Sequence, residues 1–212
     1  MKNDSNICEH CNVRHPIDRW NCGGCGQSLV LDAKGKIAIW RLGDIKDGLL
    51  GPVVAAVRRS FGCPVVIQPG FVDDRPSLRP TWSGRSATVL INQMHARRTQ
   101  GVLANFCVTE DNITFNKRYH FLFGLAWLGL GAAVMGIEAL RADDPNPQTL
   151  VERMSRIAVH ELGHAFGLDD MPYDHADCVM CGEVEEDSIE SIDAGTIRFC
   201  KDCRSQLDSA GR

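Results

Sequence analysis

The chain has 212 residues, of which 44% are hydrophobic, and it carries a formal net charge of -4 with a pI near 6.0. This length and hydrophobic content suffice for one globular domain with a small appendage. The weakly acidic charge provides no basic surface, which argues against nucleic acid and membranes as partners.

The N-terminal sequence and the cysteines indicate the compartment. The first 20 residues lack the hydrophobic core of a secretory signal, so we expect a cytoplasmic protein. Eight of the ten cysteines form four Cys-x-x-Cys pairs, which in a reducing compartment indicate metal ligands rather than disulfides. The other two, Cys63 and Cys107, are expected to be buried and unreactive.

Residues 1–30 contain the first two of these pairs. Ten residues separate the pairs, and together the pairs offer four thiolates to one tetrahedral zinc ion, a closed structural site. The ligands would be Cys8, Cys11, Cys22 and Cys25. We therefore predict a zinc ribbon over residues 1–30, which could also bind a protein partner, followed by a linker at residues 31–36.

The main domain, residues 37–212, opens with alternating strand and helix patterns. Residues 36–42 alternate as a strand, residues 43–62 have the pattern of a helix, and residues 63–70 that of a second strand. A further strand is expected within residues 101–112. The strand, helix, strand order predicts an α/β sheet.

A long hydrophobic segment follows at residues 121–137. It has no charge across 17 residues, while a membrane-spanning helix needs about 20. Four glycines interrupt it, and no polybasic flank accompanies it. We predict two short buried elements joined by a glycine-rich turn.

The longest helix is expected within residues 146–166, opening at Thr149. Thr149 and Glu152 match the capping-box pattern of a helix start, and hydrophobic residues recur at steps of three and four after them. Gly167 suits the left-handed conformation that ends many helices. The chain should therefore turn sharply just after His164.

This helix carries the sequence His-Glu-x-x-His. His160 and His164 lie one turn apart on the same face, so both imidazoles can reach one zinc ion. Glu161 would lie beside the metal without binding it, where it could take a proton from metal-activated water and pass it to a leaving amine. The motif also occurs by chance in unrelated proteins, so the rest of the sequence must support it.

The surrounding sequence resembles the archaemetzincins, which are metzincin-type metallopeptidases. Their pattern is H-E-x-x-H-x-x-G-x-x-H-C-x-x-x-x-C-x-M followed by C-x-x-C, and this chain has HELGHAFG at residues 160–167, CVM at 178–180 and FCKDC at 199–203. Residues 97–126 are also similar to the family's glutamine-containing helix, strand end and Phe-x-Phe-Gly-x-Ala segment. The resemblance covers about 170 residues but excludes the ribbon.

The resemblance implies a fold and an activity. The fold would be α/β, with a twisted mixed sheet packed against helices, one of which carries the histidine motif. The activity would be zinc-dependent hydrolysis of a peptide or protein substrate, bound along an edge strand near residues 132–141. His160 and His164 would be zinc ligands, Glu161 the general base, and Met180 the Met-turn methionine beneath the metal.

The chain departs from the family pattern at the third ligand, where Asp170 replaces histidine. A carboxylate oxygen binds zinc at about 2.0 to 2.2 Å, so Asp170 can complete the site. His175 is the alternative third ligand if the intervening loop bulges outward. A third interpretation is that Asp170 only caps the loop.

The cysteine that should follow the third ligand is also replaced, by Met171. Four thiolates are still available for a second structural zinc site, from Cys178, Cys181, Cys200 and Cys203. The sequence thus predicts one catalytic and two structural zinc ions. The alternative function is a zinc-stabilised protein-binding scaffold with weak or no peptidase activity.

Overall fold

The computed structural model describes residues 5–7, 14–16, 35–68, 84–98, 101–115, 122–143, 145–171, 177–182 and 188–209. Near the N-terminus, the strands β1 (Ser5–Ile7) and β2 (Arg14–Pro16) form an antiparallel pair. The four cysteines of the predicted ribbon and most of the linker lie outside the described residues. The ribbon therefore stays a prediction.

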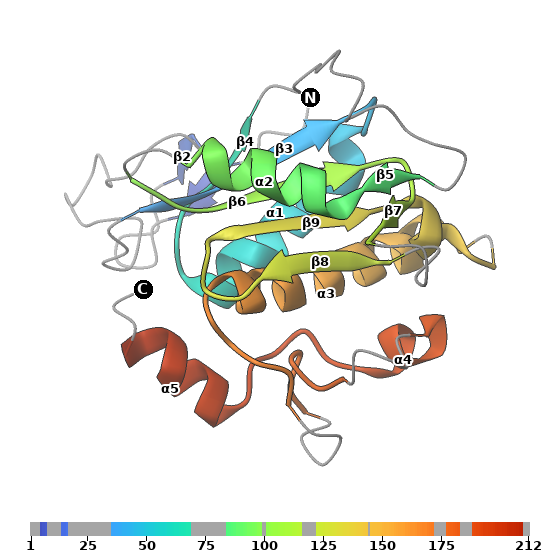
Figure 1. Ribbon diagram of the computed structural model, residues 1–212. Coiled ribbons are helices and arrows are strands. Elements are labelled where there is room, and N and C mark those ends of the chain that lie inside the picture. The colour runs from blue at the N-terminus through green and yellow to red at the C-terminus, as the bar shows by residue number, and fades with distance from the viewer. Residues whose placement is uncertain are drawn as a thin grey trace.

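A five-stranded mixed sheet forms the centre of the main domain (Figure 1). Its strands, in spatial order, are β4 (Val65–Gln68), β3 (Lys36–Leu42), β6 (Val102–Thr109), β9 (Ala132–Gly136) and β8 (Gly124–Trp127). The neighbours pair in parallel except β8, which is antiparallel to β9. The predicted mixed α/β class is confirmed.

Helices cover both faces of this sheet (Figure 1). Helix α2 (Ala87–Ala96) lies on one face, and α1 (Asp47–Phe61) and α3 (Pro147–Ala165) lie on the other. The C-terminal segment, with α4 (Ile189–Ala194) and α5 (Lys201–Ser209), lies on the far side of α3 from the sheet. Helix α3 is therefore enclosed between the sheet and the C-terminal segment.

Shorter elements complete the described fold. Strands β5 (Arg85–Ser86) and β7 (Ile113–Thr114) form a separate parallel pair. A 3-10 helix, η2 (Glu138–Arg141), connects β9 to α3. The hydrophobic segment at residues 121–137 contains β8, a turn and β9, so the prediction of two short elements is confirmed. None of the helices in the described part of the chain is long and apolar enough to cross a membrane.

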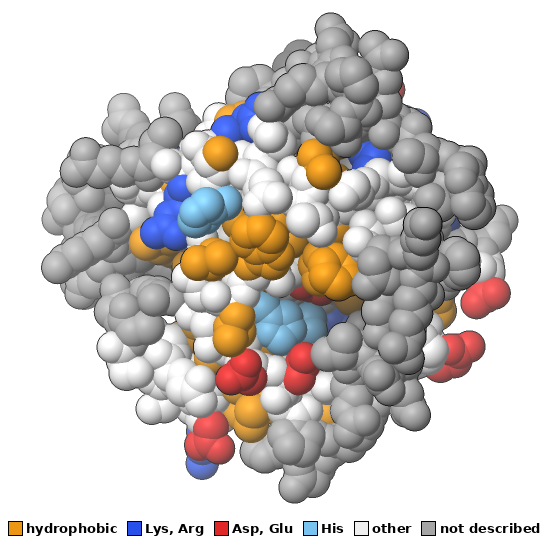
Figure 2. Space-filling model, viewed as in Figure 1, with side chains coloured by type: hydrophobic (Ala, Val, Ile, Leu, Met, Phe, Trp, Pro, Cys, Tyr) orange, Lys and Arg blue, Asp and Glu red, His pale blue; other side chains and the backbone are white. Residues whose placement is uncertain are grey.

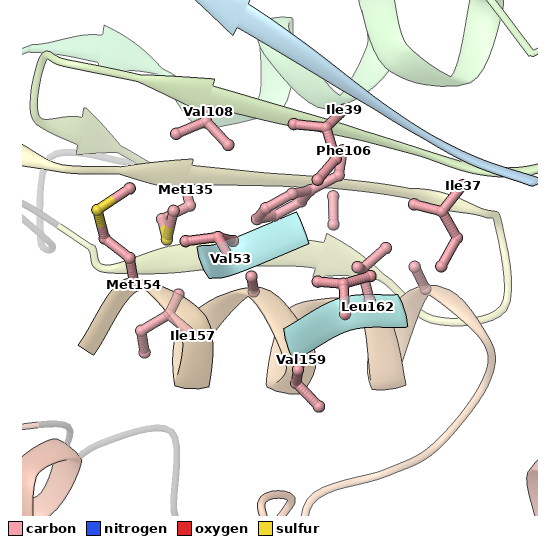
Figure 3. Close-up of a cluster of buried hydrophobic side chains, with 14 of the residues drawn as sticks. Ile37, Ile39, Val53, Phe106, Val108, Met135, Met154, Ile157, Val159 and Leu162 are labelled. Atoms are coloured by element: carbon pink, nitrogen blue, oxygen red, sulfur yellow. The ribbon is translucent and has the colours of Figure 1, made fainter. Parts of the chain in front are cut away.

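The main hydrophobic core lies between the sheet and the pair α1 and α3 (Figure 3). Phe106 and Met135 from the sheet and Leu162 from α3 are fully buried in it. Val159 points away from the sheet, toward the C-terminal segment, where Val179 belongs to the same buried cluster (Figure 3). Helix α3 is thereby fixed on two sides by apolar packing, which is the main source of fold stability.

An ion pair between a buried arginine and an exposed aspartate joins the C-terminal segment to α3. The guanidinium of Arg153, 5% exposed, donates two hydrogen bonds of 2.7 Å to the two carboxylate oxygens of Asp193 in α4. It also donates to the carbonyl oxygens of Leu140 and Ala142. Such bidentate geometry satisfies the buried charge and orients both partners.

Two sequence predictions need correction here. Helix α3 begins at Pro147, and its N-cap is Asn146, whose side chain accepts hydrogen bonds from two backbone amides. The predicted capping by Thr149 and Glu152 is wrong, because Asn146 followed by Pro147 starts the helix earlier. The edge strand is also not β9, which lies between β6 and β8. β8 precedes β9 in the hairpin and pairs with its outer side, so β8 is the edge strand.

Candidate metal centre

Helix α3 presents the two histidines at its C-terminal end. Gly167, at φ 96°, ends the helix in a left-handed turn, and its amide donates to the His164 carbonyl. This conformation is costly for residues with a side chain, which explains the glycine and confirms the predicted helix end. The chain then doubles back, so that Asp170 approaches the same face of the helix.

The three candidate ligands come together at one point. His160, His164 and Asp170 each offer one atom within 4.8 Å of the others. Asp170 Oδ1 lies 3.5 Å from His160 Nε2 and 3.3 Å from His164 Nε2, and the two Nε2 atoms are 3.0 Å apart. A tetrahedral zinc ion with bonds of about 2.0 to 2.1 Å separates its ligand atoms by about 3.3 Å. These residues therefore fit a zinc ion, and His175 lies outside the described residues.

The hydrogen bonds of the two imidazole rings also indicate that a cation fits between them. His160 Nδ1 donates to the carbonyl oxygen of Val179 at 2.9 Å, and His164 Nδ1 donates to that of Leu168 at 2.7 Å. Because a carbonyl oxygen only accepts, both Nδ1 atoms carry protons and the neutral rings turn bare Nε2 lone pairs toward each other. Facing lone pairs repel, so the arrangement is stable only with a cation between them.

In the metal-free protein a proton can serve as this cation. Burial and the charge of His164 lower the pKa of His160 to about 4. Burial also disfavours the charged form of His164, but its hydrogen bond with Asp170 and the charges of Glu161 and Asp170 outweigh burial and raise the pKa of His164 to about 9. Burial raises the pKa of Asp170, and the two histidines reverse this effect, so the net shift is downward. At neutral pH the two rings therefore share one positive charge, which the ionised Asp170 balances.

Glu161 lies between α3 and the edge strand. Its side chain is 7% exposed and packs directly on the backbone of Gly124, the first residue of β8. A Cβ atom at position 124 would lie only 2.6 Å from the carboxyl carbon of Glu161. The carboxylate is therefore held beside the histidines, at the edge where an extended peptide could pair with β8.

Met180 lies beneath the same part of α3. Its side chain is fully buried, and its sulfur packs directly on Gly163, between the two histidines along the helix. A side chain at position 163 would occupy the place of this sulfur. The floor under the histidines thus needs a glycine in the helix.

The C-terminal cysteines form a second cluster. Cys178, Cys200 and Cys203 each place a sulfur within 4.8 Å of the others, and the sulfurs of Cys178 and Cys203 are 3.6 Å apart. A tetrahedral zinc ion with sulfur ligands at about 2.3 Å spaces them by about 3.8 Å, so three sulfurs fit. Within the described residues, Cys181 lies outside this group, although its amide donates to the Cys178 carbonyl.

The thiols of this cluster differ in acidity. Burial disfavours the thiolate of Cys200, but hydrogen bonds from Cys203 and Cys178 outweigh it and lower the pKa of Cys200 to about 7. Burial raises the pKa of Cys203 well above its ordinary value. Cys200 is therefore the more readily ionised of these two thiols. By contrast, Cys63 and Cys107 are both buried, as expected, and burial raises the pKa of each to about 12.

The turn between β8 and β9 borders the centre, and the sequence did not suggest a role for it. The amide of Gly129 donates to the His164 carbonyl at 2.9 Å, and that of Gly131 donates to the Ala165 carbonyl at 3.0 Å. Leu128 and Leu130, which alternate with these glycines, are 52% and 41% exposed. Figure 2 shows histidine side chains at the surface below a band of hydrophobic side chains and beside acidic ones.

The comparisons with known proteins agree with this arrangement. The model of peptidase family M54 matches residues 92–209. The archaemetzincin of Pyrococcus furiosus is 34% identical over 116 residues, which are 53% of this chain and 57% of that protein. The chain thus matches a little over half the length of this curated relative.

Solved structures extend the likeness over most of the chain. The archaemetzincin structure from Methanopyrus kandleri has a TM-score of 0.69 at 21% identity, covering 84% of this chain and 96% of that one. The archaemetzincin from Archaeoglobus fulgidus, solved in complex with malonate, has a TM-score of 0.64 at 26% identity and covers 81% and 99%.

The fold and the site together define a class, that of mixed α/β domains with a candidate metal centre on the helix beneath an antiparallel edge strand. The matched family model covers more than half of the chain and includes both ligand clusters. The chain belongs to peptidase family M54.

Proposed function

We propose that this protein is a zinc-dependent peptidase with His160, His164 and Asp170 as the metal ligands. The observation that carries the proposal is the convergence of two Nε2 atoms and one carboxylate oxygen at the spacing of a tetrahedral zinc site. Zinc in such a site acidifies water and polarises a carbonyl group. Family membership supports this class of reaction.

Glu161 is proposed as the general base. Its carboxylate is held against Gly124 of β8, near enough to His164 for its charge to raise the pKa of that ring. A peptide extended along the edge strand β8 would bring its scissile carbonyl past this carboxylate. Glu161 would take a proton from the attacking water and pass it to the nitrogen of the leaving amine.

Asp170 brings a negative charge to the ligand set. A charge of -1 among the ligands reduces the net charge of the loaded site, which weakens the acidification of water relative to three neutral histidines. The same charge compensates the cation in a half-buried site.

We also propose a structural metal in the cluster of Cys178, Cys200 and Cys203, with Cys181 as the fourth ligand after rotation of its side chain.

The test replaces the proposed base. Glu161→Gln should keep its zinc and lower kcat for hydrolysis of peptides by about 100-fold to 10000-fold, the usual contribution of a general base. Glu152→Gln is the matched control, because Glu152 lies on the same helix, is exposed, and accepts a hydrogen bond from the side chain of Gln148. Cleavage at the wild-type rate by Glu161→Gln would refute the role of Glu161.

The alternative function is a zinc-stabilised protein-binding scaffold, and the replacement of a histidine by Asp170 is the observation that favours it. Zinc content separates the two functions. A loaded histidine site, the two proposed cysteine sites and peptide cleavage together support the peptidase. An empty histidine site in a protein that retains its cysteine-bound zinc would support the scaffold.

A further inference from the structure

His160 depends on a hydrogen bond from outside its own helix. Its Nδ1 donates to the carbonyl oxygen of Val179, 2.9 Å away and 19 positions further along the chain. This bond determines which ring nitrogen carries the proton and how the ring is turned, so it decides whether Nε2 faces the metal position. His164 differs, because its Nδ1 donates to Leu168 in the turn that directly follows α3.

The position of the Val179 carbonyl is set by the cysteine cluster. Val179 directly follows Cys178, whose sulfur lies 3.6 Å from that of Cys203 and accepts a hydrogen bond of 3.3 Å from the amide of Cys200. The amide of Val179 itself donates to the Arg198 carbonyl at 2.6 Å. The peptide that orients His160 is therefore part of the segment that holds the cysteines.

Met180, the residue after Val179, connects the same segment to α3. Its sulfur packs on Gly163, and its carbonyl accepts from the amide of Met171 at 2.7 Å, one position after the proposed ligand Asp170. Two of the three proposed ligands thus border the segment from Cys178 to Met180. A displacement of this segment would turn His160 and shift the chain beside Asp170 together.

We propose that the cysteine cluster is a positioning element for His160, acting through the Val179 carbonyl, so that metal bound by the cysteines strengthens metal binding by the histidine site. Without a metal, Cys178 is tied to Cys203 only by a weak thiol hydrogen bond. Metal–thiolate bonds would replace this contact and hold the segment in place. The inference rests on the proposed metal centre and does not require that centre to be catalytic.

The expected change in zinc affinity follows from the hydrogen bond between His160 and the Val179 carbonyl. Loss of a hydrogen-bond partner behind a metal-binding histidine lowers metal affinity by about 10-fold to 100-fold. An empty cysteine cluster should therefore weaken the histidine site by this factor while leaving all three of its ligands in place. Because coupling between binding sites is reciprocal, metal at the histidines should strengthen the cysteine site by the same factor.

The experiment counts bound zinc in full-length variants equilibrated against a series of chelator concentrations. Cys200→Ser removes one thiolate and should cost two zinc ions per chain at a chelator strength that leaves the wild type fully loaded. Cys200→His keeps a metal ligand at the same position, since three cysteines and one histidine also bind zinc. This variant should restore the affinity of the histidine site to within about threefold of wild type.

Two further variants separate coupling between the two sites from general destabilisation and from the absence of a histidine site. Cys107→Ser is the control for general destabilisation, because Cys107 is fully buried in the cluster on the opposite face of the sheet from α3. It should lower the melting temperature without changing the zinc count. His160→Ala should lose one ion at the histidine site, and an unchanged count would refute the proposed metal centre itself.

Coupling is refuted if Cys200→Ser loses a single zinc ion and its histidine site keeps wild-type affinity. It is also refuted if Cys200→His retains its cysteine-bound metal but fails to restore that affinity. If Cys200→Ser does not fold, the reciprocal measurement decides: His160→Ala should weaken zinc binding at the cysteines by about 10-fold to 100-fold, and an unchanged cysteine affinity would overturn the proposal.

Discussion

The replacement of Gly124 by alanine tests how Glu161 is held. The added Cβ atom would lie 2.6 Å from the carboxyl carbon of Glu161, whereas ordinary van der Waals contacts begin at 3.4 Å. The carboxylate must therefore move by roughly 1 Å, and a displacement of this size can reduce catalysis by about 100-fold. We expect Gly124→Ala to lower kcat/KM for peptides by about this factor and to keep its zinc.

The assay combines peptide hydrolysis, zinc content and thermal unfolding. Overpacking of this kind typically lowers the free energy of unfolding by about 1 to 3 kcal/mol, so assays are run well below the melting temperature. Gly51→Ala is the matched control, because a Cβ at this position in α1 meets no atom within 4 Å and should leave activity unchanged. A folded Gly124→Ala protein with wild-type activity would refute either the contact or the role of Glu161.

Two further predictions concern metal binding. Asp170→Ala should lower zinc affinity by more than about 100-fold, because loss of a hydrogen-bond partner behind a metal ligand already costs about 10-fold to 100-fold. Asp170→His should keep the affinity of the wild type. Equal affinity of Asp170→Ala and wild type in chelator competition would exclude Asp170 as a ligand. The pKa of His164 is raised from 6.5 to about 9 in the metal-free protein, so zinc must displace a proton below that pH. Apparent zinc affinity should therefore rise about tenfold per pH unit between about pH 6 and pH 8, and a flat profile would contradict this. The stability that protonated His164 gives the metal-free protein should be complete below about pH 6.5 and lost as the pH rises through about 9.

Local features of the fold could be predicted well from the sequence. The alternation in residues 36–42 and the turn glycine at 167 correspond to observed elements, because strand periodicity and left-handed turns depend on a few neighbouring residues. The start of α3 was predicted too late. Two adjacent capping patterns competed there, and Asn146 before Pro147 forms the cap.

Contacts between distant segments could not be predicted in the same way. The resemblance suggested an edge strand near residues 132–141, but β8 pairs outside β9 and takes the edge. Of the four C-terminal cysteines expected in one site, the structure brings three together, and the spacing within a Cys-x-x-Cys pair does not determine where the sulfur of Cys181 points.

The candidate metal-binding groups and the spacing of His160 and His164 can be predicted from the chain's residues alone, because one helical turn places positions i and i+4 on the same face. Three contacts appear only in the folded chain: Asp170 reaches both rings, Val179 orients His160, and Gly124 leaves room for Glu161. The physical reason is that these contacts join residues whose distance depends on the path of the whole chain, which is set by packing α3 between the sheet and the C-terminal segment.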